Sequence, residues 1–185
     1  MAALTPSQTV GPFFHLGFAP LNRDRLALGG ARGEAITVQG RILDGNGAAV
    51  SDAVIEIWQA DSDGRYPRPE GEPGESGCRG FGRIPTDHTG AFRLTTVKPG
   101  RVPGPGGALQ APHLVATVLA RGLLRQLTTR IYFPDEPSNP TDAVLALVPA
   151  ERRETLIAKP AAGAANLLEW NVILQSAGET VFFDV

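Results

Sequence analysis

Apolar and polar residues alternate with a period of two in several short segments, the pattern of half-buried strands. The clearest segments are residues 36–42 and 168–175. Further strands are expected at residues 54–58, 91–97, 113–120, 125–133 and 180–185. Short strands with frequent turns and little helix predict an all-β, antiparallel-rich sandwich.

Glycine and proline, at 22 and 16 of 185 residues, interrupt this pattern with turns. The segment Asp44-Gly45-Asn46-Gly47 predicts a turn after the first strand, and residues 54–58 are interpreted as the return strand. Residues 64–90 are rich in both residue types and are expected to form a long irregular loop. Loops of that length in a compact domain are usually functional.

Helix is expected only near residues 141–154. Thr141-Asp142 can cap a short helical stretch at residues 143–147, and residues 149–154 predict another turn.

The N-terminal residues 1–20 predict an arm. Their prolines and glycines forbid a long helix, while their apolar side chains need a surface against which to pack: Phe13, Phe14, Leu16 and Phe18. Two alternatives stay open, because the arm can pack on its own domain or across a subunit boundary. The chain is expected to be a single domain, with an arm and loop at residues 1–35 and the sandwich at residues 36–185.

Charge and cysteine content narrow the class of protein. A formal net charge of −2 argues against a nucleic-acid or anionic-membrane partner. The one cysteine, Cys78, excludes an internal disulfide framework and favours a reducing compartment. No secretory signal and no apolar stretch of bilayer length is visible, so a cytoplasmic protein is expected.

Few residues suggest chemistry on their own. A metal site on the strand that begins at His113 would need a second ligand two residues on, where Val115 cannot coordinate a metal. Arg130 lies mid-strand among apolar neighbours and would need a carboxylate, carbonyl groups or an anionic ligand, unless it is simply an exposed arginine on a half-buried strand.

Several motifs, taken together and in order, resemble those of the intradiol ring-cleavage dioxygenases. They lie at residues 6–13, 42–60, 63–66, 81–83, 96–100, 111–113, 129–133, 152–159 and 178–184. The arm, the run RRETLIAK and the ending GETVFFD are similar to the iron-free α chain of the two-chain members. The resemblance implies a transthyretin-like β-sandwich of mixed sheets with long loops and one or two short helices.

The catalytic chains of this family hold non-haem Fe(III) with two tyrosines and two histidines. Val102 stands at one tyrosine position, and residues 67–82, where another would lie, contain no tyrosine. The histidine pair becomes His113-Leu114-Val115, and a family arginine just before it corresponds to about Gln110. The resemblance therefore implies vestigial positions at Val102, Gln110, His113 and Val115, no metal in this chain and no catalytic residue.

The same resemblance implies a partner. An iron-holding β chain of the same fold would pair with this chain, and several such pairs would form a larger hetero-oligomer. The complex would cleave 3,4-dihydroxybenzoate with O2 to 3-carboxy-cis,cis-muconate in aromatic catabolism, the β-ketoadipate pathway.

The resemblance also implies which residues of this chain complete the partner's substrate pocket. They are Thr9, Gly11, Pro12 and Phe13 of the arm, with Phe13 where the family often has tyrosine, and Arg130, which would attract the substrate carboxylate. The alternative is a stand-alone transthyretin-like binding module without enzymatic activity.

Overall fold

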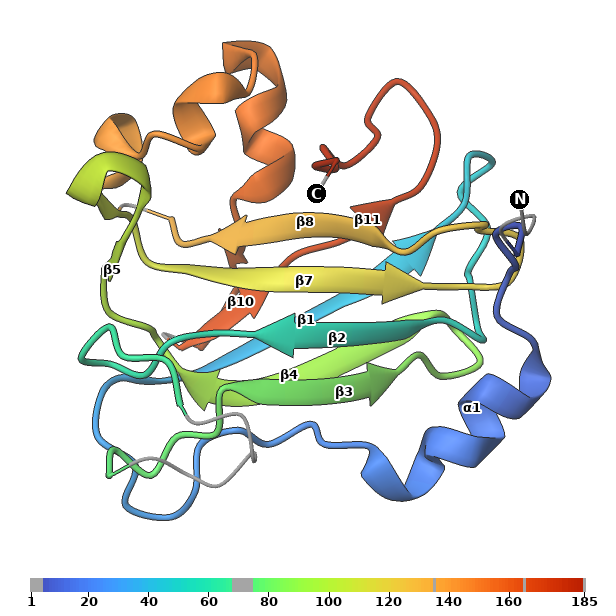
Figure 1. Ribbon diagram of the computed structural model, residues 1–185, viewed down its shortest axis with the longest axis horizontal. Helices are drawn as coiled ribbons and strands as arrows, with labels where there is room; N and C mark the ends of the chain where they lie inside the picture. The colour runs from blue at the N-terminus through green and yellow to red at the C-terminus, as the bar shows by residue number, and fades with distance from the viewer. Residues whose placement is uncertain (1–4, 68–74, 135, 165, 185) are drawn as a thin grey trace.

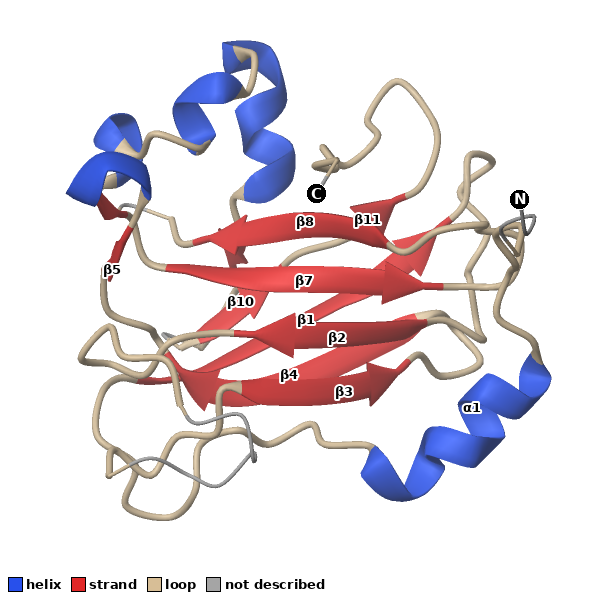
Figure 2. Ribbon diagram, viewed as in Figure 1, coloured by secondary structure: helices blue, strands red, loops and turns tan. Residues whose placement is uncertain are grey.

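Two β-sheets packed face to face make up the sandwich in the computed structural model (Figure 1; Figure 2). The structure describes residues 5–67, 75–134, 136–164 and 166–184. The sheet nearer the viewer in Figure 1 is called the β7 sheet, and the one behind it the β1 sheet. Strands from both halves of the chain enter each sheet, so the sequence-predicted β-sandwich is confirmed.

The β7 sheet is antiparallel throughout, with strand order β3-β2-β7-β8. Its strands are β2 (Val54–Trp58), β3 (Phe81–Pro85), β7 (His113–Leu119) and β8 (Leu127–Tyr132). Strands β7 and β8, which match the strands expected at residues 113–120 and 125–133, pair directly across the turn at Arg121-Gly122.

The β1 sheet is mixed, as the family resemblance implies. Its strands are β1 (Ala35–Leu43), β4 (Ala91–Val97), β9 (Lys159–Pro160), β10 (Leu167–Glu169) and β11 (Val172–Ile173). Strand β1 pairs antiparallel with β4, and parallel with both β10 and β11.

The strand predicted at residues 168–175 is interrupted in the structure. Strands β10 and β11 keep one register against β1 but are separated by Trp170 and Asn171. The Trp170 carbonyl comes so close to Gly40 that a Cβ atom at that position would overlap it. The Asn171 side chain accepts the Arg41 N–H in place of a backbone carbonyl. Close approach at a glycine therefore breaks the ladder.

Helical segments are short and more numerous than the one or two expected. The α-helix α1 (Pro12–Phe18) leads into the 3₁₀ segment η1 (Ala19–Leu21). Further 3₁₀ segments are η2 (Pro105–Gly107), η3 (Asn139–Thr141), η4 (Leu145–Leu147) and η5 (Ala150–Leu156), and β5 (Val102–Pro103) pairs with β6 (Leu109–Gln110). No helix among the described residues has the length and apolar character to cross a membrane.

The prediction of an uninterrupted loop at residues 64–90 is wrong, because β3 lies within it. Gly82 and Pro85 obscure the alternation in the sequence. In the structure Gly82 faces inward under Leu26, where a Cβ atom would collide with that side chain. A strand that uses glycine to admit a neighbouring side chain carries no strong apolar signal.

Two further strand predictions need correction. Residues 54–58 form a strand, but β2 does not return along β1; it enters the opposite sheet and pairs with β3 and β7. Residues 180–184 do not form a strand, since their strand-like pairing is one bridge between Phe183 and Thr128. A turn signal marks a change of direction but does not identify the sheet that the chain enters next.

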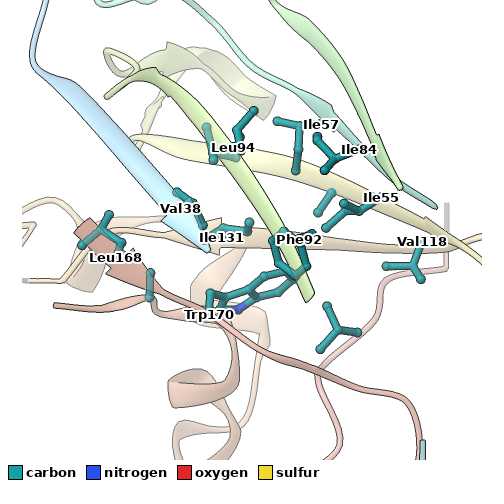
Figure 3. Close-up of a cluster of buried hydrophobic side chains, with 14 of the residues drawn as sticks. Val38, Ile55, Ile57, Ile84, Phe92, Leu94, Val118, Ile131, Leu168 and Trp170 are labelled. Atoms are coloured by element: carbon teal, nitrogen blue, oxygen red, sulfur yellow. The ribbon is translucent and has the colours of Figure 1, made fainter. Parts of the chain in front are cut away.

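The core between the sheets is built from the inward residues of the predicted alternation (Figure 3). Val38, Leu94 and Leu168 of the β1 sheet meet Ile57 and Ile131 of the β7 sheet. Each side chain of this size stabilises the fold by about 1.5–3 kcal/mol when fully buried.

A buried amide also joins the sheets. Gln59, which follows β2, donates through Nε2 to the Val97 carbonyl at 3.1 Å. Its Oε1 accepts the Thr96 hydroxyl at 2.6 Å. Because Thr96 and Val97 end β4, this side chain connects the last residues of strands in opposite sheets.

We expect Gln59→Met to lower the free energy of unfolding by about 2 kcal/mol, because the Thr96 hydroxyl and Val97 carbonyl would stay buried without their partner. Chemical denaturation of the purified chain measures this change. Gln126→Met, at an exposed residue, serves as the control and should change stability by less than about 0.5 kcal/mol. Equal stability of the two variants would contradict the assigned role of Gln59.

Candidate functional site

The N-terminal arm is fixed to its own domain at two points. Thr9 Oγ1 accepts the Gly122 N–H at 2.8 Å, in the turn between β7 and β8. At the other end of α1, the Arg83 guanidinium lies 4.3 Å from the Phe18 ring centroid, and Arg83 in turn pairs with Glu56. The arm therefore does pack on its own domain, which is one of the two alternatives that the sequence left open.

The middle of the arm presents apolar side chains outward. Pro12 takes the first helical position after Gly11, the usual place for proline in a helix. In the helix that follows, Phe13 is 84% exposed and Leu16 is 65% exposed. This arrangement leaves an apolar surface between the two anchored ends.

Arg130 lies on the outer face of the β7 sheet, where Val115 is its cross-strand neighbour. Its Nη1 donates to Gln110 Oε1 at 2.8 Å and to the Tyr132 hydroxyl at 3.3 Å. Within the described part of the chain, Arg130 forms no ion pair with a carboxylate. The guanidinium is half-buried and held by neutral oxygen atoms.

The four positions that the resemblance identifies as vestigial lie around Arg130. Gln110 bonds it directly, and Val102 pairs with Gln110 between β5 and β6. Val115 lies opposite Arg130, and His113 precedes Val115 on the same strand face. Sequence positions spread over 29 residues are thus brought together by β5, β6, β7 and β8.

The buried carboxylate of Asp142 supports this cluster. It accepts the Tyr132 hydroxyl at 3.0 Å and the backbone N–H groups of Ala111, Val144 and Leu145 at 2.7, 3.0 and 2.7 Å. Burial alone would raise the pKa of Asp142, but these hydrogen bonds outweigh it and hold the pKa below its usual value. The predicted cap of a helix at residues 143–147 needs correction, because Thr141 ends η3 and η4 begins only at Leu145, with Val144 at its N-cap. Asp142 instead binds the N–H groups of Val144 and Leu145 from outside the segment, and it also orients Tyr132.

The Tyr132 hydroxyl connects Asp142 to Arg130. Burial raises the pKa of Tyr132 well above its ordinary value, so the phenol keeps its proton and donates it to Asp142. Its oxygen then accepts from Arg130. The guanidinium is therefore held by a chain of hydrogen bonds that ends in a buried anion.

His113 is buried and neutral. Its Nδ1 lies 2.8 Å from the Ala111 carbonyl, an acceptor only, so this nitrogen carries the proton. Burial, and after it the positive charge of Arg130, lowers the pKa of His113 to about 4.

The donor set at these positions does not fit ferric iron. Two of the four side chains are valines without a coordinating atom, and the Gln110 amide oxygen already accepts a hydrogen bond from Arg130. The Arg130 guanidinium places a positive charge beside the fourth side chain, the His113 imidazole. Over the part of the chain that the structure describes, no cluster of three histidine, cysteine, aspartate or glutamate side chains could hold a metal ion.

The structure places Arg130 apart from the arm. Thr9 is anchored beside Ala120, and Val115, the neighbour of Arg130, lies five residues earlier along β7. At about 3.3 Å per residue, roughly 17 Å separates the two points. Thr9 and Arg130, both expected to line one partner pocket, therefore lie on separate parts of this chain's surface.

Sequence reasoning missed an aromatic pair beside Arg130. The Trp58 and Tyr66 rings are parallel within 4°, with centroids 5.8 Å apart. Trp58 is the cross-strand neighbour of Val115. The alternation of residues along the strand predicts that Trp58 faces outward, but it does not predict that β2 pairs with β7.

A separate hollow of about 980 Å³ lies along β1, β3 and β4. Its charged lining is balanced between three cations and three anions: Arg41, Arg83, Arg93, Asp24, Asp87 and Glu169. None of the site residues predicted from the sequence lines this hollow.

Comparison with known proteins identifies the family. Residues 9–176 match the family model described as dioxygenase. The chain is similar to the dioxygenase domain of a dioxygenase–carbohydrate-binding protein fusion from Streptomyces sp. SirexAA-E, with a TM-score of 0.66, 27% identity, and coverage of 94% of this chain and 100% of that one. The chain therefore belongs to the intradiol ring-cleavage dioxygenase family, as its motifs predicted.

Within that family, the chain is similar to proteins named protocatechuate 3,4-dioxygenase alpha chain. It is 44% identical to the one from Burkholderia cepacia, over 98% of this chain and 97% of that protein. The Pseudomonas putida protein is 41% identical, over 97% and 96% of the two chains. The beta chain from Burkholderia cepacia is 30% identical, over 83% of this chain and 66% of that protein.

The low pKa of His113 predicts acid-sensitive stability. The folded state keeps His113 neutral down to a pH of about 4, whereas the unfolded state binds a proton below about 6.5. Because the unfolded state then binds more protons, the free energy of unfolding falls as the pH drops below about 6.5. The decrease from His113 is about 2 kcal/mol at pH 5.

Denaturation of wild type and His113→Gln at pH 7.5 and pH 5 measures this dependence. We expect His113→Gln to lose about 2 kcal/mol less than wild type over that interval, and the exposed-site control His88→Gln to behave as wild type. A wild-type pH dependence retained in His113→Gln would show that other groups cause it.

Proposed function

We propose that this chain is the α subunit of a protocatechuate 3,4-dioxygenase and completes a site whose iron belongs to a β chain. The observation that carries the proposal is the 44% and 41% identity, over nearly full length, to proteins named as that α chain. The donor set around Arg130 supports it, since a chain unsuited to iron needs a partner for this chemistry. The same near full-length identity favours this function over a stand-alone binding module.

The reaction proposed for the complex is intradiol cleavage. The ring of 3,4-dihydroxybenzoate opens between its two hydroxyl-bearing carbons, and both atoms of O2 enter the product, 3-carboxy-cis,cis-muconate. The iron of the β chain would supply the redox chemistry of this step. This chain would supply binding surface and charge, within the β-ketoadipate pathway and in the cytoplasm.

The arm is the segment proposed to reach the partner's pocket, through Thr9, Gly11, Pro12 and Phe13. Its two anchors hold it in place, and the exposed Phe13 ring has an apolar surface left to bury. Phenylalanine carries no hydroxyl, so its contribution would be apolar packing. In this proposal the chain is a single domain, with the arm and loop at residues 1–35 and the sandwich at residues 36–185.

Co-expression with a β chain tests the proposal. We expect the two chains to purify together as an active complex with iron in the β chain, and this chain alone to be inactive and to bind no stoichiometric iron. Native mass spectrometry and iron quantification for each separated chain measure both results. A chain that binds iron in a one-to-one ratio by itself, or stays a lone monomer beside the β chain, would overturn it.

Arg130 is proposed to attract the substrate carboxylate. We expect Arg130→Ala in the complex to raise KM for protocatechuate about tenfold, since a charge-assisted hydrogen bond is worth about 1.5–3 kcal/mol. KM for catechol, which lacks the carboxylate, should change little. Arg93→Ala, at an exposed arginine of the β1 sheet, is the control. Equal changes for the two substrates would contradict a carboxylate-binding role.

A further inference from the structure

One row of side chains crosses the outer face of the β7 sheet. Trp58 of β2 pairs with Val115 of β7, which pairs with Arg130 of β8. Residues in register on neighbouring strands point to the same face, because side chains alternate along each strand. The row therefore places an aromatic ring, an aliphatic side chain and a cation in line.

The aromatic end of the row is a partly exposed stacked pair. Trp58 is 36% exposed and Tyr66 is 47% exposed, and their rings are parallel. Burial raises the pKa of the Tyr66 phenol, and the positive charge of Arg130 opposes that rise. The charge of Arg130 therefore acts across the space between β8 and this pair.

The cationic end is held in place before any ligand arrives. Arg130 uses Nη1 for both of its hydrogen bonds to described residues, which leaves the other guanidinium N–H groups for a further acceptor. Its partner Gln110 is fixed by donating to the Pro103 carbonyl at 3.1 Å. Arg83 and Arg121, by comparison, each pair with a carboxylate.

The spacing suits a ring that carries an acid group. Trp58 and Arg130 are two strands apart, about 9–10 Å across the sheet, and Val115 forms an apolar floor between them. An aromatic ring packs against another at about 4.5–7 Å between centroids. A carboxylate on the far side of such a ring then lies within hydrogen-bonding reach of the guanidinium, whose planar fork matches carboxylate geometry.

We infer that the outer face of the β7 sheet around Trp58, Val115 and Arg130 binds a small aromatic carboxylate on this chain itself. The site uses no metal ion and no residue of a partner chain, so it goes beyond the function proposed above. The ring would lie over Val115 against Trp58 and Tyr66, and its carboxylate would accept hydrogen bonds from Arg130.

Tryptophan fluorescence tests this inference with the purified full chain and benzoate as the probe. The two tryptophans differ in exposure, since Trp170 is buried in the core and Trp58 borders the site. We expect benzoate to change the fluorescence saturably in wild type. The change should disappear in Trp58→Phe, where only Trp170 reports.

Three comparisons define the site. Arg130→Met should weaken benzoate binding at least tenfold, and Arg130→Lys should bind with intermediate affinity. Arg93→Met, the matched exposed arginine of the other sheet, should bind as wild type. Benzamide, a neutral probe of similar shape, should bind wild type no better than benzoate binds Arg130→Met. Circular dichroism checks that each variant is folded.

Some results would overturn the inference. They are an absence of saturable binding by the folded chain, equal affinity of wild type and Arg130→Met, or equal affinity for benzoate and benzamide. A substrate-selective rise of KM in the complex without any benzoate binding by the separate chain would assign Arg130 to the partner's pocket alone. That last result would leave the proposed function in place, so the two failures can be told apart.

Discussion

The outer face of the β7 sheet depends on the hydrogen bonds that the buried Asp142 carboxylate accepts. A buried anion is costly unless it is fully hydrogen-bonded, and Asp142 is satisfied only when three segments converge on it. These are the start of η4, the residue that follows β6 and the end of β8. Leu145, Val148 and Leu156 pack beside it in a second apolar cluster. Asp142 and this small core therefore help to attach the helical segments above β8 in Figure 1, together with hydrogen bonds such as that from Trp170 Nε1 to the Thr155 carbonyl.

Two side chains, Tyr132 and Arg130, connect the buried Asp142 carboxylate to the surface of the sheet. Asp142 accepts the Tyr132 hydroxyl, Tyr132 accepts from Arg130, and Arg130 also donates to Gln110, one of the positions that the resemblance implies to be vestigial. Valine at two of the vestigial positions, Val102 and Val115, offers no coordinating atom. Burial, and after it the charge of Arg130, lowers the pKa of His113 and disfavours its imidazolium form. These hydrogen bonds hold a positive charge on this face of the sheet.

Sequence periodicity predicted the strands whose inward residues are large and apolar, including β1, β4, β7 and β8. It failed at β3, where Gly82 makes room for Leu26, and at Trp170, where the approach of Gly40 interrupts the ladder. It also failed at residues 180–184, where apolar side chains cover the sandwich without joining a sheet. In each case a contact distant in sequence decided the local structure.

Arg130 was recognised from sequence because a guanidinium among apolar residues requires a partner, but the identity of that partner depends on strand register. Pairing of β2 with β7 and of β7 with β8 brings Trp58 into the row of Arg130, although 72 residues separate them. The same geometry separates Arg130 from Thr9, since the arm is anchored at the far end of β7. Family motifs assigned these residues to one pocket, whereas the sheet gives the arm and the guanidinium different neighbours. An apolar, anchored arm suits contact with another chain, and a preorganised cation beside aromatic rings suits a small anion.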